Sequence, residues 1–259
     1  SVTGDIGMVA KSSNQETTLI IPPIRQEIIK LRIIGTTPMF QNRMAEKARQ
    51  QLLVGSAKKT KAERVEIKHD PLSEFRSSAE MLKTGPTALG IRVVAVKAAM
   101  CQAALETPGL TKTSAQRLLF MPGDHYALYG TPQLRIDVVR SADINRTPDM
   151  RSRCFIPRWG AEVEIRYVRP ALNASGVASL LANAGFLIGI GDFRQDKGKG
   201  AFGSFRVIGP DEHDAEWNDL VAHHGRDAQI EALRDPEFAN EETEELMDFY
   251  KAEVHRRAA

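Results

Sequence analysis

The chain contains little cysteine and no long apolar run. Its 259 residues include two cysteines, Cys101 and Cys154, whose contexts show neither disulfide nor metal-ligand spacing. No stretch approaches the roughly 20 apolar residues that a membrane-spanning helix needs, and residues 1–11 lack the basic and apolar regions of a secretory signal. Because free thiols are typical of a reducing compartment, we expect a cytoplasmic protein with no membrane partner.

Motifs of common catalytic sites are also lacking. The sequence has no Walker loop, no HExxH or CxxC pair and no serine in a nucleophile elbow. Histidine stands beside a carboxylate or a second histidine in His69-Asp70, Asp124-His125 and His223-His224, but adjacent side chains point apart. We therefore expect no enzyme, no metal and no cofactor. An RNA-cutting enzyme with a single histidine as general base is the alternative.

Charge is distributed very unevenly along the chain. Asp211–Ala259 hold 15 Asp/Glu against 5 Lys/Arg, a net charge of −10, so residues 1–210 carry 30 Lys/Arg against 18 Asp/Glu, a net charge of +12. A basic body predicts a polyanionic partner. The acidic segment is expected to mimic that partner or to dock on a neighbouring subunit. Alternatively, it only keeps a basic body in solution.

Hydrophobic periodicity and turn residues predict a mixed α+β fold. The expected elements are a strand at 26–36, a helix at 39–53, a helix at 91–106, strands at 116–121, 125–129, 134–140 and 161–169, a helix at 173–183 closed by Gly185, a strand pair at 186–190 and 204–208, and two acidic helices at 213–234 and 240–257. Residues 54–83 and 142–159 are expected to be irregular. This order predicts a ferredoxin-like or RRM-like β-α-β-β-α-β core at 23–210. Its large basic insertion at about 43–85 follows the first strand, and the core lies between a flexible arm (1–22) and an acidic helical tail (211–259).

A glycine-rich loop at 189–205 is the sharpest local signal for function. Glycine lets backbone N–H groups approach a phosphate closely. Within the loop, Arg194, Lys197 and Lys199 would add positive charge, and Phe193 or Phe202 could stack on a base. The alternative is a β-hairpin whose glycines form turns and whose phenylalanines belong to the core.

Two further basic segments are candidate phosphate contacts. One is an arginine cluster around Trp159, which comprises Arg146, Arg151, Arg153, Arg158, Arg166 and Arg169. Arginine suits bidentate phosphate recognition, although the same residues could form salt bridges, partly to the acidic tail. The other is the insertion, where Lys58, Lys59 and Lys61 would follow a backbone without sequence specificity, or would simply form a solvated face.

Several segments together resemble a family of uncharacterised bacteriophage and prophage proteins. These segments are IIGTTPM at 33–39, VKAAM at 96–100, DVVR at 137–140, AGFLIGIGDFR at 184–194 and FGSF at 202–205. More distantly, the pattern is similar to the RAMP superfamily, whose ferredoxin-like subunits bind guide RNA in CRISPR effectors. The resemblance implies that Arg92 and Lys97 face the nucleic acid, that the loop at 191–203 closes over it, and that the insertion forms a thumb-like element.

The sequence thus predicts a non-enzymatic protein that binds the backbone of single-stranded RNA or DNA in a bacterial host cell. Filaments or rings of subunits, or a multi-subunit complex, are the expected assemblies. The first alternative is a phage structural or assembly protein whose charge asymmetry serves only subunit contacts. The second is a RAMP-like endoribonuclease.

Overall fold

The computed structural model describes residues 23–44, 53, 69–140, 148–197 and 200–258. In chain order its elements are β1 (Arg25–Gly35), β2 (Met39–Gln41), α2 (Pro71–Ser78), β3 (Leu89–Arg92), α3 (Val93–Ala103), η2 (Ala104–Glu106), α4 (Lys112–Leu118), β4 (Leu119–Phe120), β5 (His125–Tyr129), β6 (Gln133–Arg140), β7 (Pro148–Ile156), β8 (Gly160–Arg169), α5 (Ala174–Leu187), η3 (Gln195–Lys197), β9 (Phe205–Ile208), α6 (Ala215–His223), α7 (Arg226–Arg234) and α8 (Glu241–Ala258). Helices combine with antiparallel sheets, so the predicted α+β class is confirmed.

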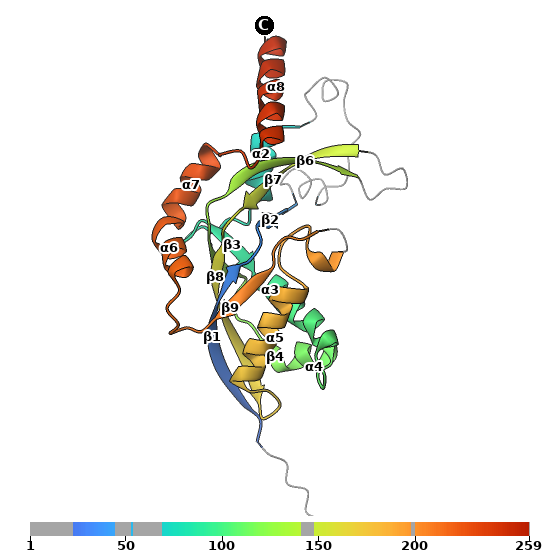
Figure 1. The fold of residues 1–259 in the computed structure, drawn as a ribbon, viewed down its shortest axis with the longest axis vertical. Coiled ribbons are helices and arrows are strands. Elements are labelled where there is room, and N and C mark those ends of the chain that lie inside the picture. Colours follow the sequence, from blue (N-terminus) through green and yellow to red (C-terminus); the bar gives the residue numbers. More distant parts are fainter. Residues whose placement is uncertain (1–22, 45–52, 54–68, 141–147, 198–199, 259) are drawn as a thin grey trace, which may run out of the picture.

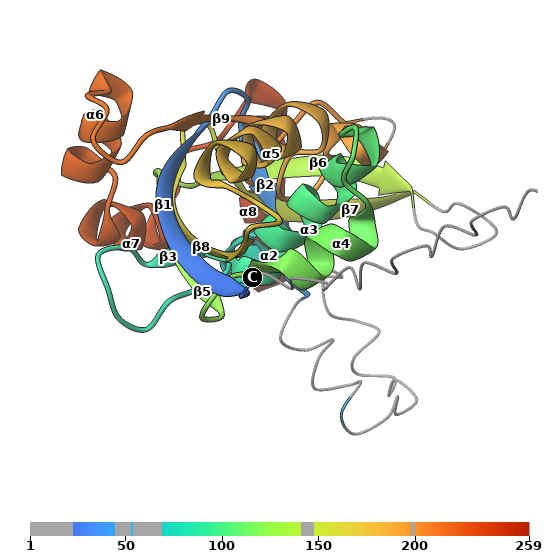
Figure 2. The same cartoon turned by 90° about the horizontal axis from the view of Figure 1, so that it is seen from below.

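The larger sheet forms the centre of the molecule. Its strands run in the order β3-β5-β8-β1-β9. β4 also pairs with β8, along the same edge of β8 as β5 but further along that strand. β1 and β8 pair over ten residues, and their apolar side chains alternate toward one face, as Val163 and Ile165 do. Helices α3 and α5 cover that face and pack on each other (Figures 1 and 2).

A smaller sheet, ordered β2-β7-β6, lies beyond the end of β1 (Figure 1). Helix α2 packs on β7 through the fully buried Phe75, and α8 packs on β6 through Met247. Both sheets contribute to one continuous hydrophobic core. The chain crosses between them through the short connection from β1 to β2, which brings the end of β1 close to loops from other parts of the sequence.

The acidic C-terminal helices pack against their own chain. Trp217 and Leu220 of α6 are buried, and Trp217 packs with Ile34 of β1 and Ile208 of β9. The buried Gln229 of α7 accepts hydrogen bonds from the backbone of β3 and its approach, and donates to carbonyl groups of β5 and the turn after it. α6 and α7 thus pack on the body of their own chain, while Val221 and Ile230 stay exposed, and docking of the acidic segment on a neighbouring subunit stays a prediction.

Several predicted elements differ from the observed ones because of long-range pairing. Residues 39–41 were expected to start a helix, but they form β2, since Met39 and Phe40 are buried against β7. The remainder of that predicted helix, 45–52, lies outside the described residues. Residues 148–156 form β7 instead of irregular chain, and 116–118 belong to α4, which Thr111 caps by accepting a hydrogen bond from the Ser114 backbone.

The ends of other helices were also misplaced. α3 begins at Val93, after β3, and the long helix predicted at 213–234 is divided at Gly225 into α6 and α7. α5 continues through Gly185 to Leu187, so the predicted strand at 186–190 is wrong. A Cβ at Gly185 would lie 2.2 Å from the carbonyl oxygen of Phe205, so this glycine serves close packing of α5 on β9 rather than ending the helix.

Within the described ranges, no helix has both the length and the apolar character needed to cross a lipid bilayer.

Candidate functional site

Three hollows that share lining residues follow one another along α3. The first, of about 280 Å³, lies between β2, the end of β3 and residues 190–194. It shares Arg194 with a second hollow of about 450 Å³ between α3 and α4. The second shares Val94 and Lys97 with a third hollow of about 470 Å³ beside Phe120. We call these three hollows together the α3 groove.

Basic residues outnumber acidic ones in the α3 groove. Three acidic residues line it, Glu80, Asp192 and Asp196, against six basic residues: Arg43, Arg92, Lys97, Lys112, Arg166 and Arg194. The described lining therefore has a formal net charge of +3. These basic residues come from six separate elements or loops, so folding gathers them from distant parts of the sequence.

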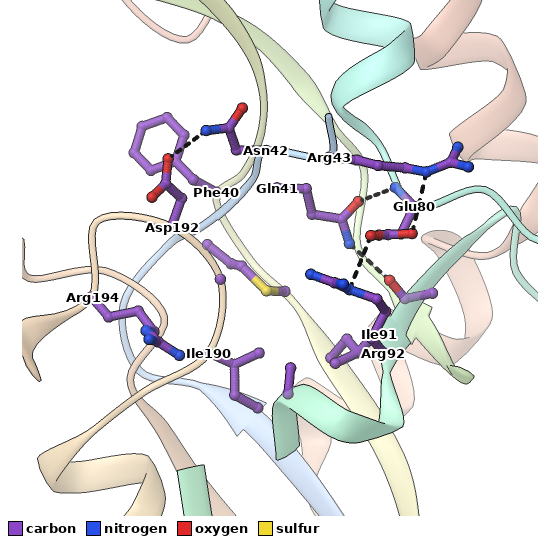
Figure 3. Close-up of a pocket in the computed structure, with 14 residues that line it drawn as sticks. Phe40, Gln41, Asn42, Arg43, Glu80, Ile91, Arg92, Ile190, Asp192 and Arg194 are labelled. Atoms are coloured by element: carbon purple, nitrogen blue, oxygen red, sulfur yellow. Dashed lines mark hydrogen bonds and ion pairs between the residues drawn. The ribbon is translucent and has the colours of Figure 1, made fainter. Parts of the chain in front are cut away.

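The first hollow is organised around Glu80. Figure 3 shows Arg43 and Arg92 reaching the Glu80 carboxylate from two sides, with Nε–Oε distances of 3.7 and 3.2 Å. The Glu80 side chain is only 16% exposed, whereas that of Arg92 is 60% exposed. His125 adds a third contact to Glu80, its Nε2 lying 3.5 Å from Oε2. Glu80 thus orients the guanidinium groups while leaving much of Arg92 accessible to a ligand.

The middle of the groove carries lysines that no carboxylate neutralises within the described residues. Lys97 Nζ lies 5.8 Å from the centre of the Phe120 ring, and Lys112 Nζ donates to Gln102 at 3.2 Å. Cys101 also lines this stretch, where burial raises the pKa of its thiol while the charges of Lys97 and Lys112 act in the opposite direction. Both ammonium groups therefore act on the same thiol.

The glycine-rich loop uses its backbone donors within the protein. The amides of Ile190, Asp192 and Gly203 donate to the carbonyl oxygens of Gly203, Phe40 and Pro38, at 2.8, 3.0 and 2.8 Å. A Cβ at Gly203, where φ is +76°, would meet the carbonyl oxygen of Ile190 at 1.8 Å. The described part of the loop thus places its glycines in close backbone contacts rather than around an open phosphate cradle.

The basic residues of this loop have different environments. The Arg194 side chain is 19% exposed, and its Nε lies 3.2 Å from Asp196 Oδ1 without forming a hydrogen bond. It still lines two of the three hollows, on the side of the first hollow formed by the loop (Figure 3). The side chain of Lys197, and Lys199 entirely, lie outside what the structure describes.

Phe193 and Phe202 pack on an aromatic and arginine cluster formed by Phe40, Phe155, Arg135 and Arg153. The Phe202 ring centre lies 4.9 Å from that of Phe40, and the Phe193 ring lies 4.3 Å from the Arg153 guanidinium carbon. Phe193 retains 37% exposure, whereas Phe202 is only partly exposed. Both rings therefore contact protein side chains, although the loop does not form the β-hairpin of the alternative, since α5 continues to Leu187 and β9 pairs with β1.

The predicted arginine cluster is dispersed by the fold. Arg153 is 1% exposed and donates to Asp137 at 2.7 Å and to Asp192 at 3.1 Å, so it cannot reach a phosphate on the surface. Arg158 donates to Asp219 of α6 at 2.8 Å, and this bond holds the pKa of Asp219 below its usual value. Here the salt-bridge alternative describes the observed contacts.

The remaining candidate contacts lie outside the α3 groove or outside the residues that the structure describes. Arg151 is exposed and lines a fourth hollow, which shares Asn42 and Arg43 with the first. Arg146 and the insertion lysines Lys58, Lys59 and Lys61 lie outside the described residues. Of the candidates on described residues, those that line the α3 groove are Arg92, Lys97, Arg166 and Arg194, and Arg151 lines the adjoining hollow.

Sequence reasoning missed other residues of the groove. Arg43 belongs to the predicted basic insertion but was not singled out there, and no local pattern distinguished Glu80, Lys112 or Phe120. The capping threonine Thr111 was the one available signal for α4, which presents Lys112 to the groove. The rest depends on which segments meet in space.

The histidine sites are held by neighbouring side chains. His69 lies between Glu74 and Asp149, at 2.7 and 3.0 Å, and His224 Nδ1 contacts the Thr131 hydroxyl at 2.7 Å. Among the described residues, no group of three or more His, Cys, Asp or Glu is arranged to hold a metal ion. These contacts join separate elements, with His69 bridging α2 and β7.

The sheet face opposite α3 and α5 presents mixed charge. Lys30 and Arg32 of β1 lie opposite Glu164 and Glu162 of β8 in the strand register. α6 covers the neighbouring part of this face, where Trp217 lies 5.4 Å from the Arg32 guanidinium carbon. The part of this face near α6 is therefore covered, whereas Phe120 of β4, which lies opposite Arg166 in the strand register, is exposed.

Comparisons with known proteins add no assignment to this geometry. No protein-family model matches the chain, and no curated protein matches it.

Proposed function

We propose that this protein binds the sugar–phosphate backbone of single-stranded nucleic acid along the α3 groove, without chemical reaction. The observation that carries the proposal is that six basic side chains from separate segments line three neighbouring hollows, which share lining residues. A phosphodiester chain places negative charges at regular intervals, and a basic groove that follows it gains affinity through counterion release. The dispersed arginines and the glycine loop have mainly structural roles in this proposal.

We further propose that the core is ferredoxin-like. Support comes from the strand order β9-β1-β8-β5, which is the 4-1-3-2 order of a β-α-β-β-α-β unit when β3 is counted as an added edge strand. α3 precedes β5, α5 follows β8, and both lie on one face (Figure 2). The resemblance to RAMP proteins stays a hypothesis, supported by the positions of Arg92 and Lys97 in the groove.

The test compares two charge-reversed proteins that differ only in where the charge is changed. Lys97→Glu with Lys112→Glu alters the groove, whereas Lys83→Glu with Lys251→Glu alters exposed lysines outside it. Filter binding to single- and double-stranded RNA and DNA 20-mers should show a preference for single strands. The groove variant should lose about tenfold or more in affinity, given two phosphate contacts reversed, and the control should lose much less.

Three results would contradict the proposal. Absence of binding by the unaltered protein would remove it altogether, and equal losses in both variants would show attraction by overall charge alone. Shortened strands on a denaturing gel would favour the endoribonuclease alternative instead.

The second candidate function is a structural or assembly protein. α8 projects from the body at its C-terminal end (Figure 1), and along this helix Phe249 is 72% and Val254 is 40% exposed. Such apolar side chains on a projecting helix favour subunit contacts. Light scattering with and without oligonucleotide distinguishes the two functions, because assemblies that take up no oligonucleotide would favour this candidate.

A further inference from the structure

The third hollow of the α3 groove lies at an interruption in the edge of the large sheet. β5 pairs with β8 at Gly160 and Ala161, and β4 pairs with β8 at Arg166 and Tyr167, so no strand that the structure describes pairs with the intervening residues of β8 on this side. The chain at 121–124 bulges between the two short pairings. Together with the first turns of α3, this bulge encloses the hollow of about 470 Å³.

Phe120 lines this hollow, and much of its side chain is exposed. Its neighbour Leu119 is fully buried, whereas Phe120 is 46% exposed. Val94 of α3, 65% exposed, contributes another accessible apolar surface. Apart from Lys97, whose Nζ lies 5.8 Å from the ring centre, no aromatic ring or cation contacts the Phe120 ring among the described residues.

The polar groups around the ring suit a nucleotide. Lys97 has no carboxylate partner among the described residues, so its ammonium group can meet a phosphate. Arg166 lies opposite Phe120 in the strand register, with its Nη2 3.2 Å from Glu164, and forms the rim. Gln26 adds an amide that can donate to and accept from a base edge.

We infer that this hollow binds one unpaired base, stacked on Phe120, with an adjacent phosphate on Lys97. Aromatic side chains stack on any base, but only when the base is not paired within a duplex, so the hollow would make the groove selective for single strands. This inference rests on the proposed function, since it concerns the same groove. It also moves the stacking role from Phe193 and Phe202, whose faces contact Arg153 and Phe40, to a residue outside the glycine loop.

The experiment uses Phe120→Ala and Phe120→Trp, with Phe249→Ala as a control at an exposed aromatic on α8. The probes are a 20-residue oligothymidylate or oligouridylate, whichever binds more tightly, and an abasic strand of the same sugar and length. Phe120→Ala should weaken binding of the strand with bases by about 5- to 150-fold, which is the range for loss of one stacked base. It should leave the weaker binding of the abasic strand unchanged. Phe120→Trp and Phe249→Ala should bind both probes as the unaltered protein does.

The outcomes separate this inference from the proposed function. Equal binding of the strand with bases by the unaltered protein and Phe120→Ala would overturn the stacking site and leave the backbone groove intact. An equal loss by Phe120→Ala on both probes, with Phe120→Trp restoring neither, would assign Phe120 a structural role and overturn the inference as well. If the unaltered protein binds neither probe, the proposed function fails and takes this inference with it.

Discussion

Replacing Lys97 with alanine should reduce the salt dependence of binding by the contribution of one phosphate contact. The groove lining carries six basic and three acidic residues. Its net positive charge can therefore neutralise about three phosphates of a bound strand. For a single strand each contact contributes about −0.7 to the slope of log K against log salt concentration, which predicts a slope of about −2. Between 50 and 200 mM salt, this slope corresponds to roughly a 20-fold loss of affinity.

Lys97 is the most informative position because its charge is not shared with a carboxylate among the described residues. Without it the excess falls to about two contacts, so the slope should fall to about −1.4 and the loss over the same salt range to about sevenfold. Arg92 should give a smaller change, because Glu80 lies 3.2 Å away and would remain as an unpartnered carboxylate near the strand.

Fluorescence anisotropy with a labelled single-stranded 20-mer, titrated at four salt concentrations, measures both slopes directly. Lys83→Ala is the matched control, since Lys83 is an exposed lysine that lines none of the three hollows. The reasoning is refuted if Lys97→Ala and Lys83→Ala give the same slope. A slope near zero for the unaltered protein would equally exclude a phosphate track.

Two predictions concern the part of the fold that holds the groove. Arg153→Ala should lower the free energy of unfolding in urea by about 3 kcal/mol, because it leaves Asp137 and Asp192 without their buried partner, although both carboxylates keep some solvent contact. A change under about 0.5 kcal/mol, typical of surface sites, would contradict this role. Gly203→Ala should lower stability by about 2 kcal/mol or more, since it combines a positive φ with a clash against the Ile190 carbonyl oxygen; an unchanged unfolding midpoint would show that the loop stem is not held in this conformation.

Local pattern was sufficient for the elements that depend on nearest neighbours. The alternation in 161–169 and 134–140 predicted β8 and β6, and the helix predicted at 173–183 matches the start of α5, where Asn173 accepts a hydrogen bond from the Gly176 amide. Where pairing partners are distant, the same reasoning failed. β2 is only three residues long and has strand geometry because β7, more than a hundred residues later, pairs with it.

The sequence indicated that the candidate site would be basic, but it did not indicate which residues would form it. An excess of basic residues before position 210 follows from counting alone, and it predicted an anionic partner. Counting cannot say which cations already have an internal carboxylate. Arg158 is matched by the acidic α6, whereas Lys112, in no charge cluster, lines the groove.

Amino-acid order by itself determined the α+β class, the principal strands and the charge asymmetry, because these depend on residue type and short-range periodicity. Only the tertiary structure decided which individual side chains are exposed and which are buried. Arg151 and Arg153 lie two residues apart on the same face of β7, yet the first is exposed and the second is buried. The difference arises because the loop carrying Asp192 and Phe193 packs over Arg153 only, and that contact spans 39 positions in the sequence.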